Sequence, residues 1–537
     1  MAKVIAYGED FRRRMLAGID QVADAVSATL GPRGRNAVMY RKAQLHGAEY
    51  ADRAMAGAKP MILNDGATIA QGIVLEDPVE ELGAQLLRQV STVTNDRAGD
   101  GTTTSVVLAR EILHLSLTNL AAGAHPLLLN KGIAGGVKVA LDSLEEQSAP
   151  ADTPQALARV AAISCQDEAL GDLVAQALSA VGPEGVVEVE DSGRRETTLE
   201  VEEGIVFERG FLSPLMATDG DQTQAVLENP LILLYDESFT SAQALIPVML
   251  LAAEADRPLL LICEGLEDEA MGLVLQNKLH GDLQVVAVQP PLYGEGRKWR
   301  LEDMAVQTGA RLVSKDLGLD VREVTLDMLG TAEKVRVTRN QTVITGPGGD
   351  PAAVDARIQE LRYMAGHTDY EFNRKRYQER LAKFVSGVAK LQVGGLTELE
   401  ITERKLRVED AVAAARAAWE EGVVPGGGTA LFRAAPAVRT WAEGLEGDVR
   451  TGARLLARAL EAPLRQIVEN AGQDGSVVAG TLANRSAGIG YDALTDTYVD
   501  MLAAGILDPR KVTRLALENA ASVAETLLTS QACLVEA

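Results

Sequence analysis

The sequence has few aromatic residues and few cysteines, and both shortages limit what the protein can be. Aromatic residues make up 4% of the 537 positions, whereas hydrophobic residues make up 47%. The cores must therefore be built from Ala, Val, Leu and Ile, the residues of packed helices and buried strands. Cys165, Cys263 and Cys533 lie far apart and form no Cys-x-x-Cys pair. We therefore expect neither a disulfide framework nor a zinc site. The lack of disulfides is typical of proteins in the reducing cytoplasm.

Basic charge and long apolar runs are also scarce. The chain has 52 Lys and Arg against 76 Asp and Glu, a formal net charge of −24. This charge disfavours binding to nucleic acid or to an anionic membrane surface. No apolar run reaches about 18 residues, the length that spans a membrane, and residues 1–10 lack the apolar core of a secretory signal. We therefore expect a cytoplasmic protein with no nucleic-acid or membrane partner.

Helices are predicted near both ends of the chain, which is long enough for two to four domains. A helix is predicted after residue 10, another after residue 104, and a third before residue 422, because apolar residues recur three or four positions apart. The three apolar stripes are Phe11, Met15, Ile19, Val22 and Val26; Leu108, Ile112 and Leu115; and Val408, Val412, Ala415 and Trp419.

A different pattern fills the middle of the sequence. Short apolar segments at 231–234, 259–263 and 283–288 are separated by stretches of helical length. This alternation is typical of an α/β layer. The sequence therefore predicts an α/β domain inserted into a helical domain that is built from both ends of the chain.

The loop at 99–104 (GDGTTT) is the strongest candidate for a ligand site. The sequence has no GxxxxGK[ST] motif, but here two glycines allow a close backbone approach to an anion. Three threonines offer hydroxyl groups, and the helix that follows presents free N–H groups. Asp100 would repel phosphate unless a hard cation such as Mg²⁺ bridged the two. The alternative is an aspartate that caps a helix in a tight turn, and the spacing alone leaves both open.

Two further aspartates and a glycine run are weaker candidates. Asp65, in residues 63–66 (LNDG), and Asp410, in residues 407–410 (RVED), could position a water for attack on a phosphoryl group. Alternatively, each could simply lie in a turn or in the first turn of a helix. The glycines at 426–428 could pass close to a nucleotide base or ribose, or could mark the end of a helix.

Several sequence blocks occur in an order that resembles one protein family. They are residues 29–36 (TLGPRGRN), 95–104 (NDRAGDGTTT), 407–411 (RVEDA), 420–428 (EEGVVPGGG) and 505–514 (GILDPRKVTR). Together they resemble the group I chaperonins of the GroEL type over nearly the whole chain. The resemblance implies the chaperonin fold, with a mostly helical equatorial ATPase domain at 1–146 and 421–537. A small intermediate domain at 147–202 and 389–420, and an inserted α/β apical domain at 203–388, are also implied.

The resemblance also implies an ATP site with Mg²⁺, and with K⁺ as a second candidate cation. Asp410 and Asp65 would be catalytic, and Asp100 would bind the metal. Asp410 would reach the phosphates only when the subunit closes, with hinges at Gly204 and Gly387. The nucleotide would be held by Thr29, Leu30, Gly31, Pro32, Asp100, Gly101, Thr102, Thr103, Thr104, Ile163, Ser164, Gly427, Asp492, Ala493, Leu494, Ile506 and Asp508.

A second implied site is an apolar groove for unfolded polypeptides in the apical domain. Without the resemblance, apolar residues at this spacing would be assigned to the core. The implied partners are unfolded polypeptides, a GroES-type cochaperonin, and identical subunits in heptameric rings stacked as a double ring. The groove residues would be Phe211, Leu215, Met216, Ile246, Met249, Met271 and Leu275.

The sequence departs from the family pattern at several places. Asn64 stands where a lysine is usual, Asp492 where asparagine is common, and Leu215 and Gln276 replace a typically aromatic and a typically aliphatic residue. The segment 37–64 is longer by about 14 residues, a length that surface loops tolerate, and 533–537 form no Gly/Met tail. These departures leave an alternative: a chaperonin-like ring that acts as a binding scaffold with weak folding activity. A small-molecule kinase would need an acceptor pocket, which no motif supplies.

Overall fold

The computed structural model describes residues 3–40, 60–182, 186–192, 194–219, 223–280, 283–292, 294–368, 370–385 and 387–536. Most of the long segment 37–64 lies outside these residues. The chain divides into two units, one made of Met1–Gln176, Val189–Thr198 and Leu391–Ala537, the other of Ala177–Glu188 and Leu199–Lys390. The boundaries fall within α8 (Glu168–Val181), β4 (Val186–Asp191), β5 (Thr198–Phe207) and β14 (Gly387–Val393). Whether the first unit divides further into an equatorial and an intermediate domain stays a prediction.

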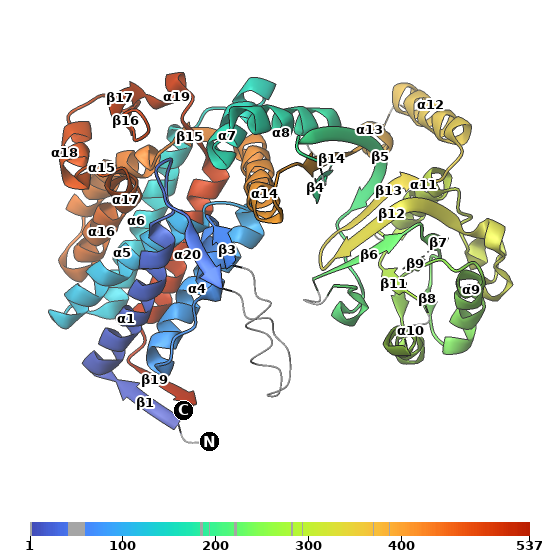
Figure 1. The fold of residues 1–537 in the computed structure, drawn as a ribbon, viewed down its shortest axis with the longest axis horizontal. Coiled ribbons are helices and arrows are strands. Elements are labelled where there is room, and N and C mark those ends of the chain that lie inside the picture. Colours follow the sequence, from blue (N-terminus) through green and yellow to red (C-terminus); the bar gives the residue numbers. More distant parts are fainter. Residues whose placement is uncertain are drawn as a thin grey trace. The chain divides into compact units, whose positions relative to one another are not determined.

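The first unit is mainly helical and contains both ends of the chain (Figure 1). Its strands form four two-stranded pairs, β1–β19, β2–β3, β15–β18 and β16–β17. Its helices are α1 (Gly8–Ser27), α3 (Gly66–Gly72), α4 (Pro78–Ala98), α5 (Thr102–Ala121), α6 (Pro126–Glu146), α7 (Pro154–Cys165), α14 (Glu398–Glu421), α15 (Thr429–Glu443), α16 (Gly447–Ala459), α17 (Ala462–Asn470), α18 (Gly475–Ala483), α19 (Met501–Ala504) and α20 (Arg510–Leu528). Its strands are β1 (Lys3–Tyr7), β2 (Ala37–Tyr40), β3 (Pro60–Leu63), β15 (Val423–Pro425), β16 (Ile489–Asp492), β17 (Thr497–Asp500), β18 (Leu507–Pro509) and β19 (Ala532–Glu536).

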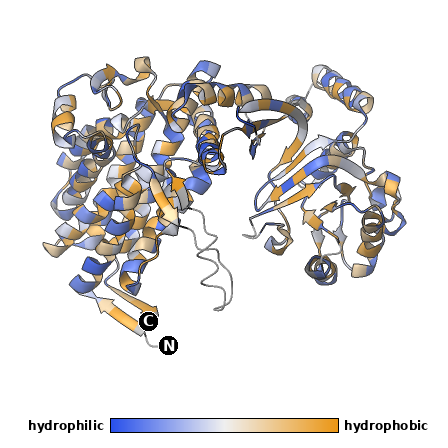
Figure 2. Cartoon of the chain, in the orientation of Figure 1, coloured by the Kyte–Doolittle hydropathy of each residue, from blue (hydrophilic) through white to orange (hydrophobic). Residues whose placement is uncertain are grey.

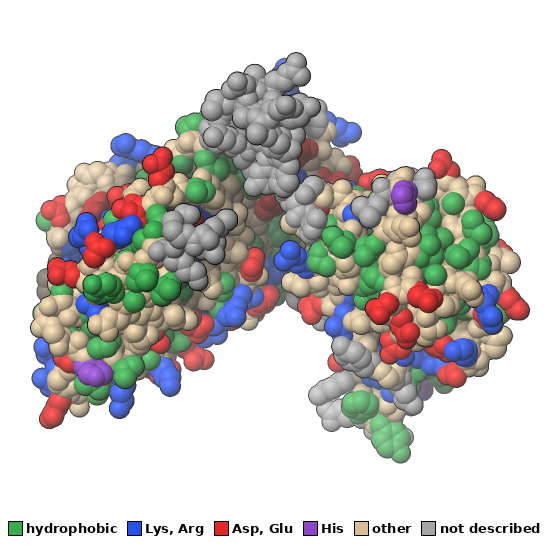
Figure 3. All heavy atoms as spheres, turned by 90° about the horizontal axis from the view of Figure 1, so that it is seen from below, with side chains coloured by type: hydrophobic (Ala, Val, Ile, Leu, Met, Phe, Trp, Pro, Cys, Tyr) green, Lys and Arg blue, Asp and Glu red, His purple; other side chains and the backbone are tan. Residues whose placement is uncertain are grey.

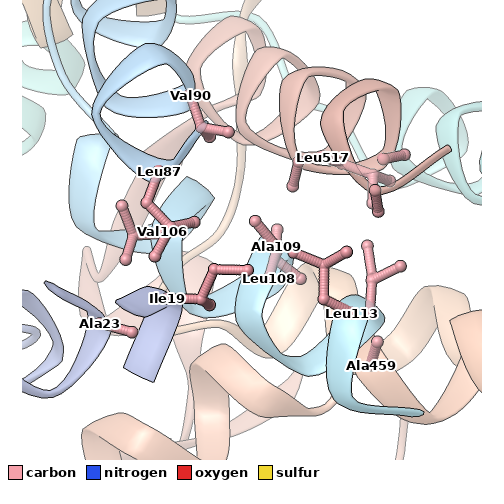
Figure 4. Packing of buried hydrophobic residues seen from close by; sticks show 14 of the residues in the cluster. Ile19, Ala23, Leu87, Val90, Val106, Leu108, Ala109, Leu113, Ala459 and Leu517 are labelled. Carbon is pink, nitrogen blue, oxygen red and sulfur yellow. The ribbon is translucent and has the colours of Figure 1, made fainter. Parts of the chain in front are cut away.

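The core of this unit consists of small and medium aliphatic side chains from α1, α4, α5, α16 and α20 (Figure 4). Ile19, Leu108 and Leu517 are fully buried there. The predicted stripe of α1 is confirmed, since all five of its apolar residues are buried. On α5, Leu108 and Ile112 are buried as predicted, while Leu115 packs partly exposed against the same core. The scarcity of aromatic residues is thus met by close helix packing.

The second unit is the predicted α/β layer. Its sheet has the strand order β11-β9-β7-β12-β13-β5-β14-β4, and β6 also pairs with β12. The neighbouring pairs β7–β9 and β9–β11 are parallel, and every residue of these three strands is buried, as is typical of strands covered on both faces. The predicted strands are therefore confirmed as β7 (Leu231–Leu234), β9 (Leu259–Ile262) and β11 (Val285–Val288).

Further helices, strands and short 3₁₀ turns complete this unit (Figure 1). The remaining elements are η2 (Pro214–Met216), β6 (Gln224–Glu228), β8 (Ser238–Phe239), α9 (Ala242–Glu254), β10 (Gly265–Leu266), α10 (Asp268–His280), α11 (Gly294–Thr308), η3 (Lys315–Leu317), η4 (Val321–Glu323), η5 (Leu326–Met328), β12 (Gly330–Thr338), β13 (Thr342–Pro347), α12 (Pro351–His367) and α13 (Glu371–Val385).

Gly204, one of the two expected hinge residues, lies within a paired strand. It belongs to β5 and is opposite Thr345 of β13. A Cβ atom at this position would lie 2.3 Å from Val388 Cγ2. Close packing between neighbouring strands is therefore a sufficient reason for glycine here, and the hinge role stays a prediction, as it does for Gly387 at the start of β14.

The pair β1–β19 presents apolar side chains to solvent, and Figure 2 shows both strands as largely hydrophobic. Ile5, Tyr7 and Leu534 are 61%, 74% and 64% exposed. Within the described residues, no helix combines the length and the apolar character needed to cross a membrane.

Candidate functional site

A cavity of about 1110 Å³ in the first unit brings the predicted nucleotide residues together. It lies among the loop after α1, the turn after β3, the start of α5, one face of α7, the first half of α14, the turn before β18 and the first turns of α20. The predicted residues that line it are Thr29, Leu30, Gly31, Pro32, Asp65, Asp100, Gly101, Thr102, Thr103, Thr104, Ile163, Ser164, Asp410, Gly427, Asp492, Ala493, Leu494, Ile506 and Asp508. The structure thus places every one of them in the lining of one cavity.

The start of α5 is open toward this cavity. Gly101 is the N-cap residue, with φ of 81°, and no side chain caps the helix. Asp100 does not cap it either: its carboxylate accepts hydrogen bonds from the Gly101 N–H and, at 3.3 Å, from Ser164 Oγ. The first N–H groups of the helix therefore have no side-chain acceptor. This arrangement favours phosphate binding over the alternative of a capping aspartate.

Glycine is required on both sides of Asp100. Gly99 and Gly101 have φ values of 69° and 81°, in the left-handed region. A Cβ atom on Gly99 would lie 2.3 Å from Ala413 Cβ of α14, and one on Gly101 would lie 2.5 Å from Val512 Cγ1 of α20. The loop is held this tightly between two helices, so its backbone is fixed before any ligand arrives.

Two other segments meet at the same helix start. The Thr29 hydroxyl lies 3.4 Å from Thr103 Oγ1 and donates to the Val26 carbonyl at 2.8 Å. A Cβ atom on Gly66 would lie 2.5 Å from Thr103 Oγ1. Hydroxyl groups from two distant segments are therefore side by side where an anion would approach the helix.

Asp65 has a structural role at the edge of the cavity. Its carboxylate caps α3, accepting from the Ala67 N–H at 3.0 Å, the Thr68 N–H at 2.8 Å and the Thr68 hydroxyl at 2.6 Å. Asp65 therefore lies in the turn before α3 as the N-cap residue of that helix. These bonds fix the carboxylate in place on the cavity wall, which is compatible with an assisting role.

Asp410 already lies on the cavity wall in this structure. It belongs to α14, which packs against α7 and α20 within the first unit. The sequence-based expectation was that Asp410 arrives only after a domain movement. Here Asp100 and Asp410 both line the cavity within the first unit, and the role of a closing movement stays a prediction.

Burial, and then the negative charge of neighbouring carboxylates, raises the pKa of three carboxyl groups of the cavity. Burial, followed by the charge of Asp65, raises the pKa of Asp100. Burial, and then the charges of Asp100 and Asp65, raise the pKa of Asp410 well above its ordinary value. Burial and Asp100 also raise the pKa of Asp508 to about 7, against the opposing effect of the Gly427 and Gly428 N–H groups. A positive charge in the cavity would reverse these shifts.

The carboxylate oxygens at this site suit a magnesium ion that arrives together with a nucleotide. Among the described residues, no group of three His, Cys, Asp or Glu side chains is placed to hold a metal. A Mg²⁺ ion at Asp100 would therefore need oxygen ligands from phosphate, which is the usual way that nucleotide-binding proteins hold this ion. The unclaimed N–H groups of α5 lie beside the same carboxylate and would hold that phosphate.

Asp492, which also lines the cavity, is engaged in its own turn. Its carboxylate accepts from the Leu494 N–H at 2.9 Å and from the Thr495 hydroxyl at 2.6 Å. Leu494 is 60% exposed, and Gly427 has φ of 62°. These turns form an open rim, in contrast to the enclosed start of α5.

Sequence reasoning missed one whole face of α7. Gln155, Arg159, Ala162 and Gln166 line the cavity together with the predicted Ile163. Their spacing of three or four residues is a helical face, so the signal was present once Ile163 was assigned. Glu403 and Arg407 of α14 were also missed; they line the cavity and form an ion pair at 2.5 Å.

The residues proposed for polypeptide binding divide into exposed and buried sets. Leu215 and Ile246 are 53% and 41% exposed, and Met271 and Leu275 of α10 are half-buried. Phe211, Met216 and Met249 are buried. Phe211 forms a β-bridge to Val288, and the Met216 sulfur accepts from the Ala287 N–H. These three side chains belong to the core of the second unit in this structure, and their role in polypeptide binding stays a prediction.

One exposed residue of this surface was missed. Leu250 is 55% exposed and lies one turn after Ile246 on α9. The helices α9 and α10 pack against each other, and Lys278 of α10 donates to the Leu215 carbonyl at 2.8 Å. Figure 3 shows hydrophobic side chains gathered on the α/β unit in the view from below. Leu215, Ile246 and Leu250 are thus exposed apolar side chains of the same unit.

The fold and the site define a class of protein. Its helical unit has a helix whose first N–H groups are uncapped, and an α/β unit is inserted into the sequence of that helical unit. The model of one family, the TCP-1/cpn60 chaperonin family, matches residues 22–537. The chain belongs to this family, and the predicted chaperonin fold and resemblance to the GroEL type are confirmed.

A solved structure shares the fold. It is the chaperonin gp146 from the bacteriophage EL 2 (Pseudomonas aeruginosa), crystallised in the presence of ATP-BeFx. The two chains are 20% identical, the match covers 99% of each, and the TM-score is 0.69. At this level of identity the likeness establishes the architecture and not the activity.

Proposed function

We propose that this chaperonin hydrolyses ATP with magnesium and uses the cycle to capture and release non-native polypeptides. The observation that carries the proposal is the single cavity in which the uncapped start of α5 faces Asp100, Asp410 and Asp508. A related chaperonin was crystallised with ATP-BeFx, which supports nucleotide binding. Phosphoryl transfer needs positioning and charge stabilisation, and this cavity has the groups for both.

The residues divide the work as follows. The N–H groups and threonine hydroxyls at the start of α5 hold phosphate oxygens. Asp100 supplies a carboxylate to the magnesium ion, which when bound neutralises phosphate charge. Asp410 orients the attacking water and takes its proton; burial and the charges of Asp100 and Asp65 raise the pKa of this carboxyl group, which increases its affinity for a proton. Asp65, fixed by its bonds to α3, assists from the adjacent wall.

Capture of polypeptide is assigned to the apolar surface of α9, α10 and η2. Leu215, Ile246 and Leu250 are exposed there, with Met271 and Leu275 beside them. Such a surface binds amphipathic segments without reading their sequence, and methionine adapts to varied shapes. We propose that the same surface also receives a GroES-type cochaperonin.

We further propose that identical subunits assemble as heptameric rings stacked in pairs. The exposed apolar side chains of β1 and β19 support contacts between copies. The three cysteines are unpaired and buried, in keeping with a reducing cytoplasm.

Refolding of a denatured substrate, measured together with ATP hydrolysis, tests the proposal. We expect magnesium-dependent release of ADP and phosphate, and refolding that depends on ATP and a cochaperonin. Hydrolysis and capture without refolding would favour the scaffold alternative. A phosphorylated product in place of free phosphate would identify a kinase and overturn the proposal.

A further inference from the structure

Helix α7 turns one face toward the nucleotide cavity. Gln155, Arg159, Ala162, Ile163 and Gln166 all line it. Toward the end of the same helix, the Ser164 hydroxyl bonds the Asp100 carboxylate at 3.3 Å. The helix thus runs along the cavity, and its residues mark positions at increasing distance from Asp100.

Arg159 is unusual in the charge balance of this wall. Nine carboxylate side chains line the cavity, against two arginines, Arg159 and Arg407. Arg407 is paired with Glu403 at 2.5 Å. Arg159 is exposed, and the structure gives it no hydrogen bond or ion pair with the described part of the chain. Its guanidinium is therefore the one unpaired cationic group on the described wall.

The stem of Arg159 is held against a particular turn. Gly505 ends α19 with φ of 76°. A Cβ atom there would lie 3.0 Å from Arg159 Cδ and 3.2 Å from its Nε. The glycine makes room for the arginine side chain, which passes over the turn leading to Ile506 and Asp508. This contact fixes the end of the cavity at which the guanidinium lies.

That end is opposite to the phosphate-binding loop. Arg159 precedes Ser164 by five residues, which is a rise of roughly 7 Å along a helix. Asp100 lies at the Ser164 end, whereas Gly505 and Ile506 lie at the Arg159 end. If phosphate occupies the start of α5, the sugar and base of the nucleotide extend toward Arg159.

We propose that Arg159 is a specificity-determining residue that binds the ribose and base end of the nucleotide. The inference rests on the proposed function and adds a residue to the same site. A guanidinium offers several donors in a planar fork, which suit the oxygen and nitrogen acceptors of a nucleoside, and its plane can also stack on a purine. Lysine would keep the charge but not the planar fork.

Titration of ATP, ADP and AMP into the wild type, Arg159→Ala and Arg159→Lys tests this inference. We expect Arg159→Ala to weaken all three by a similar factor, on the order of 10-fold, because the nucleoside end is common to them and a hydrogen bond from a charged group is lost. Arg159→Lys should recover only part of the loss. Arg454→Ala is the matched control, since Arg454 is exposed on α16 and does not line the cavity.

Three results would overturn the assignment. They are unchanged affinities in Arg159→Ala, a loss that grows with the number of phosphates, or full recovery in Arg159→Lys. The melting temperature without nucleotide should be the same in all variants, because the side chain is exposed. If the wild type itself bound no nucleotide, the proposed function would fail as well, and this outcome is distinct from a failure of Arg159 alone.

Discussion

At the scale of single residues, the cavity depends on a division of labour at the start of α5. Gly101 occupies the cap position and leaves the helix N–H groups open, while Asp100 bonds Gly101 and Ser164 and keeps its carboxylate in the cavity. An aspartate at the cap position itself would have used up those N–H groups. The offset of one residue separates an anion site from an ordinary capped helix.

Asp410→Ala should slow the hydrolytic step while nucleotide affinity stays nearly unchanged. A group that orients water acts in the transition state, so we expect single-turnover hydrolysis to fall by on the order of 10²-fold or more. Glu409→Ala is the control, because Glu409 is the exposed neighbour on the same helix. A wild-type rate in Asp410→Ala would remove Asp410 from the mechanism.

Binding of magnesium with ADP should release protons near neutral pH. Raised pKa values leave carboxyl groups such as Asp508, with its pKa of about 7, partly protonated in the free protein. A bound cation favours their ionised forms, so affinity should rise from about pH 6 to about pH 8. Calorimetry in two buffers of different ionisation enthalpy measures the protons released.

Two variants sharpen this measurement. Asp508→Asn should release fewer protons, and Asp100→Ala should lose magnesium-dependent binding.

The raised pKa of Asp508 also predicts how stability changes with pH. The folded protein holds this proton more tightly than the unfolded chain does. Between pH 3.8, the ordinary pKa, and about pH 7, the free energy of unfolding of the nucleotide-free protein should therefore fall as pH rises. Binding without any proton exchange would contradict this account of the cavity.

At the scale of elements, α9 combines core and surface within two turns. Leu245 and Met249 are buried under the sheet of the second unit, while Ile246 and Leu250 face outward. The hydrophobic pattern is nearly continuous along this helix, so periodicity cannot separate the two sets. Only the packing of α9 against its neighbours decides which residues a polypeptide can reach.

Ile246→Glu should abolish capture of denatured protein and weaken cochaperonin binding while the basal ATPase is unaffected. A charge in an apolar contact must lose its water without gaining a partner, which costs several kcal/mol at a buried interface. Met249→Glu is the informative comparison, because Met249 is 8% exposed and a charge there should destabilise the second unit instead.

The two variants must first be compared by circular dichroism and gel filtration. Folded and assembled Ile246→Glu that still captured substrate as well as wild type would place the polypeptide surface elsewhere. A Met249→Glu variant as stable as Ile246→Glu would show that the two faces of α9 are assigned wrongly.

At the scale of the whole molecule, the two ends of the chain meet in β1 and β19 and expose apolar side chains there. We expect wild-type protein to sediment as an assembly many times the mass of the 57.0 kDa chain. Ile5→Glu should shift it toward smaller species, because Ile5 is 61% exposed and a charge there opposes contact between copies. Val477→Glu, at a position 64% exposed on α18, is the control. An unaltered sedimentation profile in Ile5→Glu would exclude this surface from assembly.

Much of the fold and of the nucleotide cavity could be predicted because the relevant signals are local. The stripe on α1, the strands β7, β9 and β11, and the GDGTTT loop are each defined by residues close together in sequence, and the structure confirms these elements. The family resemblance then gave the order in which distant motifs meet. The cavity residues that the resemblance implied all line this one cavity.

What only the tertiary structure decided depends on contacts between distant segments. The burial of Phe211, Met216 and Met249, the pKa of Asp508, and the place of Arg159 over Gly505 each result from a neighbour far away in the sequence. The amino-acid pattern specifies which side chains are apolar or charged and at what period they recur. Burial and electrostatic shifts depend instead on the distance between side chains and on the water excluded around them, and these are set only when the elements pack.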